Sequence, residues 1–239
     1  KSHLQIDSEP HSRIQSEWIW CLIFWTVDRQ NRMNPSAENH SPNTDADWCS
    51  AEREARRSLE SARGSRDASL LDTALTQLRE AWQARANAAL EHAAEHGVQC
   101  TEVPNNDEFV PDPGIHLITA PQVGADARRL LTAGLEHGVP VLALAREPMT
   151  KLGERPVAVL GRGVVVRTRI EPEKEADHPS LAWWKMAFSA LVEAAQRADD
   201  PTASPERRLE IMLDRLDGLP GLSTELIEDA RELAAMKSE

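Results

Sequence analysis

The middle of the chain combines two apolar runs with a helical pattern between them. Residues 115–120 and 139–145 are short runs rich in aliphatic side chains, typical of strands that are buried on both faces. Apolar residues recur at helical spacing from Ala127 to Leu135, and Gly138 ends this helix. A strand, a helix and a second strand predict a right-handed βαβ unit with parallel strands.

Further strands on both sides extend this unit into a sheet. Residues 98–103 are predicted to form one strand, and residues 157–160 and 164–170 to form two more around Gly161-Arg162-Gly163. A three-residue loop with glycine predicts a hairpin. We therefore predict an α/β fold with a three-layer, Rossmann-like core and a mixed, mainly parallel sheet of about five strands. Helices at the N-terminal side and a C-terminal three-helix segment flank this core.

Two helices are predicted before the sheet. Residues 50–63 form a charged helix with little apolar content, which Gly64 ends. Asp67 or Ser69 can cap a longer helix that runs to about His96. Its apolar positions step by three and four in a continuous seam, a pattern that favours core packing over a coiled-coil partner.

The C-terminal helices raise the question of a tryptophan pair. We predict helices at 181–198 and after Ser204, and a last one that begins near residue 223. Trp183 and Trp184 are neighbours on the first of these helices. Because two neighbouring side chains point in different directions, we expect one to be half-exposed at the helix edge or at a partner surface.

Residues 1–46 differ from the rest of the chain. One interpretation places the native start at Met33, so that residues 1–32 are not native. The other makes the tryptophan-rich run 18–27 a hydrophobic arm that docks on the body or on a partner. A polar linker follows over 34–47. The predicted domains are a non-core arm and linker, a charged helix, an α/β core and a helical segment, at 1–46, 47–66, 67–170 and 171–239.

Composition narrows the range of partners and compartments. The net charge of −12 argues against general binding to a nucleic-acid backbone, which depends on clustered Lys and Arg. The apolar run 18–27 is too short to span a bilayer, so we expect no membrane association. Three cysteines without CxxC spacing argue against a disulfide framework and favour a reducing, cytoplasmic location.

The carboxyl ends of the parallel strands are the candidate ligand site. Ligands of open α/β sheets bind at this edge, where helix N-termini offer free backbone N–H groups to anions. Backbone N–H groups near Gly124 could hold a phosphate or carboxylate, and Arg146 could supply countercharge. The candidate residues are Thr119, Gln122, Gly124, Arg146, Glu147 and Glu102, with Thr101 beside them.

Other chemistry-bearing residues have simpler interpretations. No GxGxxG, GxxxxGK[ST] or GxSxG motif occurs, so no cofactor and no catalytic residue is assigned, and whether the chain is an enzyme stays open. His92 and His96 lie four apart with Cys100 beyond, but two surface histidines near a helix end are favoured over a zinc site. His116 lies in an apolar strand and is expected to be a core histidine with a backbone partner.

Two functional hypotheses remain. The first, favoured because motifs are lacking, is a non-catalytic interaction or assembly subunit that binds a protein partner or itself. It would use the 68–96 helix, the tryptophan pair or the arm. The alternative is a binding or enzymatic domain for a small anionic, nucleotide-like ligand at the strand edge.

Overall fold

A computed structural model describes residues 44–65, 67–105, 108–174, 177–219 and 230–232. These residues belong to one of the two compact units of the chain, Asn43–Glu239, and the other unit is Lys1–Pro42. The arm, the start at Met33 and most of the last predicted helix therefore lie outside the described residues. Within them, no helix is long and apolar enough to cross a membrane.

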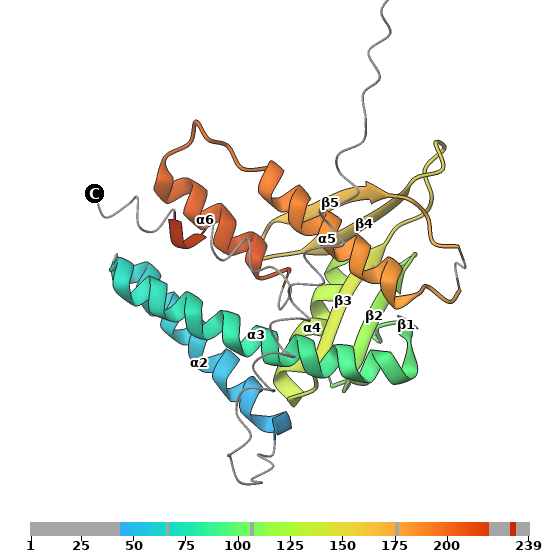
Figure 1. Ribbon diagram of the computed structural model, residues 1–239, viewed down its shortest axis with the longest axis horizontal. Helices are drawn as coiled ribbons and strands as arrows, with labels where there is room; N and C mark the ends of the chain where they lie inside the picture. Colours follow the sequence, from blue (N-terminus) through green and yellow to red (C-terminus); the bar gives the residue numbers. More distant parts are fainter. Residues whose placement is uncertain (1–43, 66, 106–107, 175–176, 220–229, 233–239) are drawn as a thin grey trace, which may run out of the picture. The chain divides into compact units, whose positions relative to one another are not determined.

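The described residues form a five-stranded mixed sheet with helices, an α/β fold (Figure 1). The strands follow one another across the sheet in chain order, and they are β1 (Val98–Thr101), β2 (Gly114–Thr119), β3 (Val141–Arg146), β4 (Arg155–Leu160) and β5 (Val165–Ile170). The first three strands are parallel, as predicted, whereas β4 is antiparallel to β3 and β5. Two of the four strand pairings are parallel and two are antiparallel, so the sheet is evenly mixed and not mainly parallel.

The predicted βαβ unit is present as β2, α4 (Gly124–His137) and β3. The strands β2 and β3 are buried along almost their whole length, which explains why both read as apolar runs. Leu130, Ala127 and Val141 join the apolar cluster between α4 and the sheet. Gly134 allows close packing here, because a Cβ on it would lie 2.9 Å from the carbonyl oxygen of Val139.

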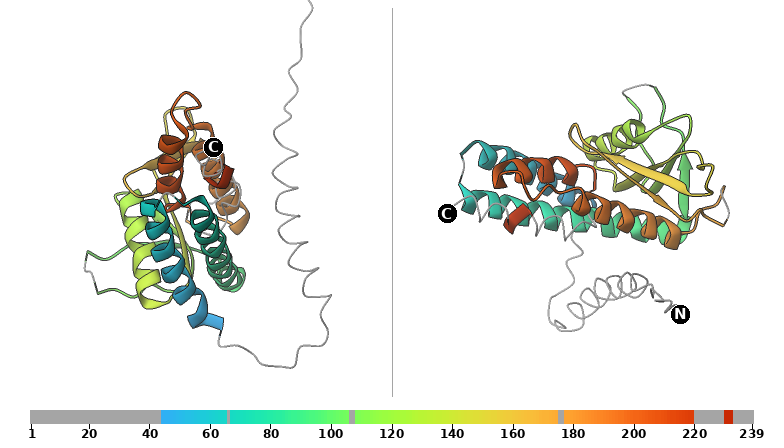
Figure 2. Two further views of the ribbon diagram at one scale, coloured as in Figure 1. Left: turned by 90° about the vertical axis from the view of Figure 1, so that its left-hand side faces the viewer. Right: turned by 90° about the horizontal axis from the view of Figure 1, so that it is seen from above.

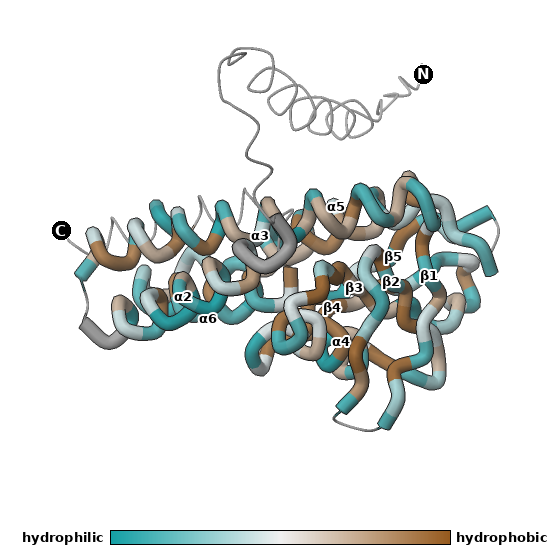
Figure 3. The backbone as a smooth tube through the Cα atoms, turned by 90° about the horizontal axis from the view of Figure 1, so that it is seen from below, coloured by the Kyte–Doolittle hydropathy of each residue, from teal (hydrophilic) through white to brown (hydrophobic). Residues whose placement is uncertain are grey.

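Two long helices, α2 (Thr44–Ser65) and α3 (Ala68–His96), form a hairpin that extends beyond the sheet (Figure 2). Asp67 caps α3, since its carboxylate accepts from the N–H groups of Ser69 and Leu70. The α3 helix packs on β2 and β3. On the hydropathy scale of Figure 3, the apolar residues gather on the strands, whereas α2 is largely hydrophilic.

The helices α5 (Leu181–Arg197) and α6 (Pro205–Leu216) follow the sheet. Both tryptophans of α5 are buried, so the prediction of an exposed one is wrong: Trp183 is 8% exposed and Trp184 0%. Trp184 packs in the core and its indole donates to the carbonyl oxygen of His116 at 3.3 Å. Trp183 lies over the chain that leaves β5 and donates to the carbonyl oxygen of Glu171 at 3.0 Å. Both side chains are buried because the sheet covers one side of α5 and the chain that follows β5 covers another.

Candidate functional site

The parallel register brings two of the predicted site residues together at the strand edge. Thr119 and Arg146 are Cα partners at the ends of β2 and β3. Glu102 is exposed after β1, and Gly124 begins α4. The register therefore places Thr119 beside Arg146, whereas a ligand site at this edge stays a prediction.

Gln122 has a structural bond at this edge. Its amide accepts from the backbone N–H of Val103 at 2.8 Å and donates to the carbonyl of the same residue at 2.6 Å. The β1 strand ends at Thr101, two residues earlier than predicted, and the Gln122 side chain replaces the missing strand partner of buried Val103.

The charges at the edge are paired within the protein. Glu173, whose side chain is 1% exposed, lies between Arg146 and Arg155, with an oxygen 3.1 Å from the Nε atom of Arg155. Glu147 pairs with Arg167. The Asp126 carboxylate accepts from the N–H of Val123 at 2.8 Å and so puts negative charge at the α4 N-terminus. An anion would have to compete with these acids, and binding at the edge stays a prediction.

His116 is a core histidine, as expected. It is 1% exposed, and its Nε2 lies 2.9 Å from the carbonyl oxygen of Asp112 and its Nδ1 2.7 Å from the Thr101 hydroxyl. Burial lowers the pKa of His116 below its usual 6.5, although the carbonyl of Asp112 opposes this shift. The folded protein therefore holds a neutral imidazole.

This lowered pKa predicts a pH dependence of stability. The unfolded chain binds the proton more readily, so the free energy of unfolding should rise with pH from the native pKa of His116 up to about 6.5. Urea unfolding of the wild type and of His116→Gln across this range measures the contribution. We expect the wild type to gain relative to the variant as pH rises, by at most about 1.4 kcal/mol per pH unit. A constant difference between the two proteins would contradict the assignment.

His92 and His96 lie in the last turns of α3, and Cys100 lies in β1. Their rings stack on each other with centroids 4.1 Å apart. The Cys100 thiol lies 3.7 Å from the carbonyl oxygen of Asp177, and burial raises its pKa. Among the described residues, no three His, Cys, Asp or Glu side chains are grouped to hold a metal ion.

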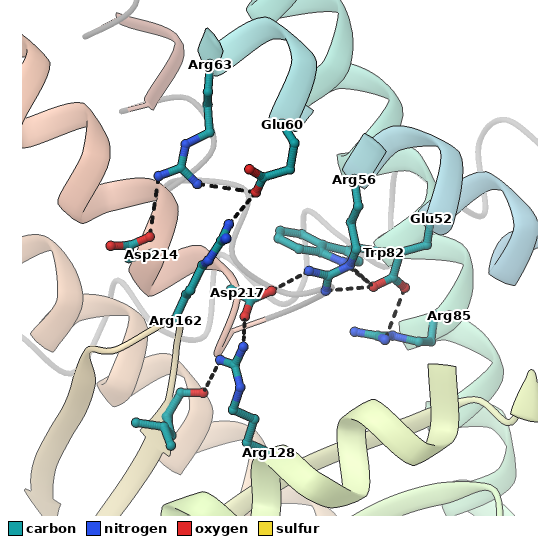
Figure 4. Close-up of polar contacts among 11 residues, drawn as sticks. Glu52, Arg56, Glu60, Arg63, Trp82, Arg85, Arg128, Arg162, Asp214 and Asp217 are labelled. Atoms are coloured by element: carbon teal, nitrogen blue, oxygen red, sulfur yellow. Dashed lines mark hydrogen bonds and ion pairs between the residues drawn. The ribbon is translucent and has the colours of Figure 1, made fainter. Parts of the chain in front are cut away.

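A second cluster, which the sequence did not predict as a site, lies where α2, α3, α4 and the end of α6 meet (Figure 4). Its centre is the Glu52 carboxylate, which is 0% exposed. One oxygen of Glu52 accepts from the Trp82 indole at 2.9 Å and from Arg56 at 2.9 Å. The other oxygen lies 3.1 Å from Arg85, which is 2% exposed. We call these residues, together with Arg128 and Asp217, the arginine cluster.

Asp217 joins the arginine cluster from the end of α6. Its carboxylate bridges Arg56 of α2 and Arg128 of α4, the latter at 2.6 Å, and Arg128 also donates to the carbonyl oxygen of Leu160 at 3.3 Å. Burial alone would raise the pKa of Asp217, but the two arginines outweigh it and lower the pKa below its usual value. The cluster thus ties helices from both ends of the chain to the sheet.

Further contacts hold α6 against the hairpin of β4 and β5. The backbone N–H of Arg162 donates to the carbonyl oxygen of Asp214 at 2.9 Å. A Cβ on Gly161 would collide with that same carbonyl group, so only glycine permits this approach. Arg63 of α2 pairs with Glu210 and Asp214 on the facing side of α6.

Two hollows lie beside these helices. A cavity of about 190 Å³ is lined by four residues of the arginine cluster and three residues of α4, namely Arg56, Arg85, Arg128, Asp217, Leu131, Thr132 and Leu135. A wider surface groove of about 440 Å³ runs between α2 and α3. Its lining residues are Trp48, Ala51, Glu54, Ala55, Gln77, Glu80, Ala81 and Ala84.

These features define an α/β protein in which a helical hairpin is attached to a mixed sheet through a buried ion-pair cluster. In comparisons with known proteins, the sequence matches no family model and no curated protein, and no solved structure matches the fold.

Proposed function

We propose that this protein is a non-catalytic interaction subunit whose partner binds in the groove between α2 and α3. The observation that carries this proposal is the lining of the groove. Alanines from both helices face it, with Ala55 and Ala81 buried at its base and Ala51 and Ala84 exposed. Small side chains let another backbone approach closely, so the groove suits a third helix.

The charges around the groove select the kind of partner. Glu54 of α2 and Glu80 of α3 line the groove on opposite helices. A helix with an apolar stripe flanked by Lys or Arg would complement both the stripe of alanines and these carboxylates. A second copy of this chain is disfavoured, because two acidic grooves on chains of net charge −12 repel each other.

The other surfaces expected from the sequence contribute less. The tryptophan pair of α5 is buried within the protein, and the arm lies outside the described residues. The small-ligand alternative at the strand edge keeps Thr119 and Arg146 as its adjacent residues. The paired charges around Arg146 favour the interaction function over that alternative.

Two finer proposals concern architecture and location. We propose that α4, which packs on β3 and β4, covers one face of the sheet and that α3 and α5 cover the other, giving the three-layer, Rossmann-like core. The domain boundaries predicted from the sequence, at 1–46, 47–66, 67–170 and 171–239, are part of the same proposal. We also propose a cytoplasmic location, which the free thiols of Cys49 and Cys100 support.

Peptide binding tests the interaction function. The probe is a helical peptide of about eighteen residues with an alanine and leucine stripe flanked by lysines, titrated calorimetrically into the full chain. Ala84→Arg should weaken binding by at least about tenfold, because it fills the groove and adds like charge. Ala182→Arg, an exposed alanine on α5, should leave the affinity unchanged.

The peptide with glutamates in place of lysines is the second control. We expect it not to bind. Equal binding of the two peptides, equal affinities of the two arginine variants, or no binding of the lysine peptide would each contradict the proposal.

A further inference from the structure

We propose that the cavity of the arginine cluster is a binding site for a small tetrahedral oxyanion of the phosphate class. Arg56, Arg85 and Arg128 reach this cavity from three different helices, α2, α3 and α4 (Figure 4). Each guanidinium group carries five N–H donors in a planar fork that matches phosphate oxygens, so groups that already pair with Glu52 and Asp217 still have further donors to offer a ligand.

The charges of the arginine cluster do not balance. Its three guanidinium groups face two carboxylates, Glu52 and Asp217, which leaves one positive charge in excess around the cavity. The body of the chain is acidic, with a net charge of −12, so this local excess has the opposite sign to the rest of the molecule. An anion bound here would restore neutrality in a region of low dielectric constant, where the attraction between opposite charges is strongest.

Arg85 shows the imbalance most clearly. It is buried, and its Nε–H group has no hydrogen-bond acceptor among the described residues. Burial lowers the pKa of Arg85, and the attraction of Glu52 opposes this shift without cancelling it. An oxyanion beside the guanidinium would supply both a compensating charge and an acceptor.

The size of the cavity limits the ligand. About 190 Å³ holds a few water molecules or one phosphate group, whereas typical pockets for nucleotide-sized ligands are larger. Leu131, Thr132 and Leu135 of α4 complete the wall, so the cavity combines charged donors with a largely apolar side. A free phosphate ion or the end of a phosphomonoester fits this combination. This proposal concerns a different surface from the α2–α3 groove and does not depend on it.

Calorimetric titration of the full chain with inorganic phosphate, at constant ionic strength, tests the site. We expect binding to the wild type and a loss of at least about tenfold in affinity for Arg128→Gln. Arg128 is one-third exposed and its partner Asp217 keeps the ion pair with Arg56, so this variant leaves no unpaired buried charge. The matched control is Arg129→Gln on the same helix, because Arg129 donates instead to the carbonyl of Pro104 at 2.6 Å and should not affect binding.

One further variant tests where phosphate binds, and one further ligand tests which kind of phosphate the site takes. Arg146→Gln should leave phosphate binding unchanged. A loss of binding in this variant would overturn the proposal and indicate that phosphate binds at the strand edge instead. A titration with glycerol phosphate then distinguishes the two sources. Affinity equal to that for phosphate indicates a site for the end of a phosphomonoester, and weaker affinity indicates a site for the free ion. No phosphate binding by the wild type, or equal loss in Arg128→Gln and Arg129→Gln, would overturn the proposal. Circular dichroism of each variant confirms that it is folded.

Discussion

Replacing Glu52 with alanine is expected to lower the free energy of unfolding by about 3–5 kcal/mol. The carboxylate is fully buried and is shared by Arg56, Trp82 and Arg85. Its removal leaves Arg85 charged in the interior without its carboxylate partner, and the loss of an ion-pair partner in a buried position costs far more than the pair itself contributes. Chemical denaturation followed by circular dichroism measures the loss.

The controls for this prediction lie on the same helices. Glu54→Ala removes an exposed carboxylate whose partner Arg57 is also exposed, so it should cost less than about 1 kcal/mol. The double variant Glu52→Leu with Arg85→Met should be more stable than Glu52→Ala, because both buried charges are removed together. Equal stabilities of the Glu52 and Glu54 variants would show that the cluster does not hold the helices.

Replacing Trp184 with alanine is expected to cost about 3–5 kcal/mol as well. Its side chain is fully buried, stacks on Phe188 with ring centroids 5.3 Å apart, and donates to the His116 carbonyl oxygen. Truncation removes a large apolar surface from the core and leaves a cavity between α5 and the sheet.

Met186→Ala on the same helix is the matched comparison for Trp184. Met186 is 41% exposed, so its truncation should change the free energy of unfolding by less than about 1 kcal/mol. Thermal unfolding of the two variants in parallel provides the measurement. A small effect of Trp184→Ala would contradict the burial of this side chain in the core.

The parallel part of the sheet could be predicted because its strands are buried on both faces. Such strands appear in the sequence as apolar runs, unbroken in residues 141–145 of β3 and interrupted only by His116 in residues 115–118 of β2. The helix α4 between them was recognisable from its spacing and from Gly138, which has a φ of 69° and ends the helix in the left-handed conformation. The balance of parallel and antiparallel pairings was less predictable, because pairing partners depend on tertiary contacts.

The arginine cluster could not be predicted as a site, because its members come from distant positions on α2, α3 and α4 and from the residue that follows α6. The sequence does contain a partial signal, namely charged residues at positions of α2 and α3 where the helical spacing predicts apolar ones. Glu52 lies four residues after Trp48 and three before Ala55, both buried, so it occupies an apolar position of α2. Arg85 lies likewise three residues after buried Trp82 on α3. Charged residues in the seams of two paired helices indicate buried ion pairs, although they do not reveal their partners.

For the predicted strand-edge site, the positions of two residues could be predicted, but their charge partners could not. Thr119 and Arg146 were brought together as expected, because parallel register follows directly from the βαβ unit. The acid that pairs with Arg146 was not foreseen, since Glu173 comes from a segment after the sheet that reads as a charged linker. Placement at a strand edge is thus predictable from topology, whereas the charge state of that edge depends on segments with no regular pattern.

Hydrogen exchange of the full chain with and without the lysine-flanked peptide tests the proposed function most directly. We expect slower exchange in residues 48–55 and 77–84, which contain the lining of the groove between α2 and α3, and no change in α4 or β5. Protection confined to other parts of the chain, or no change on adding the peptide, would contradict it.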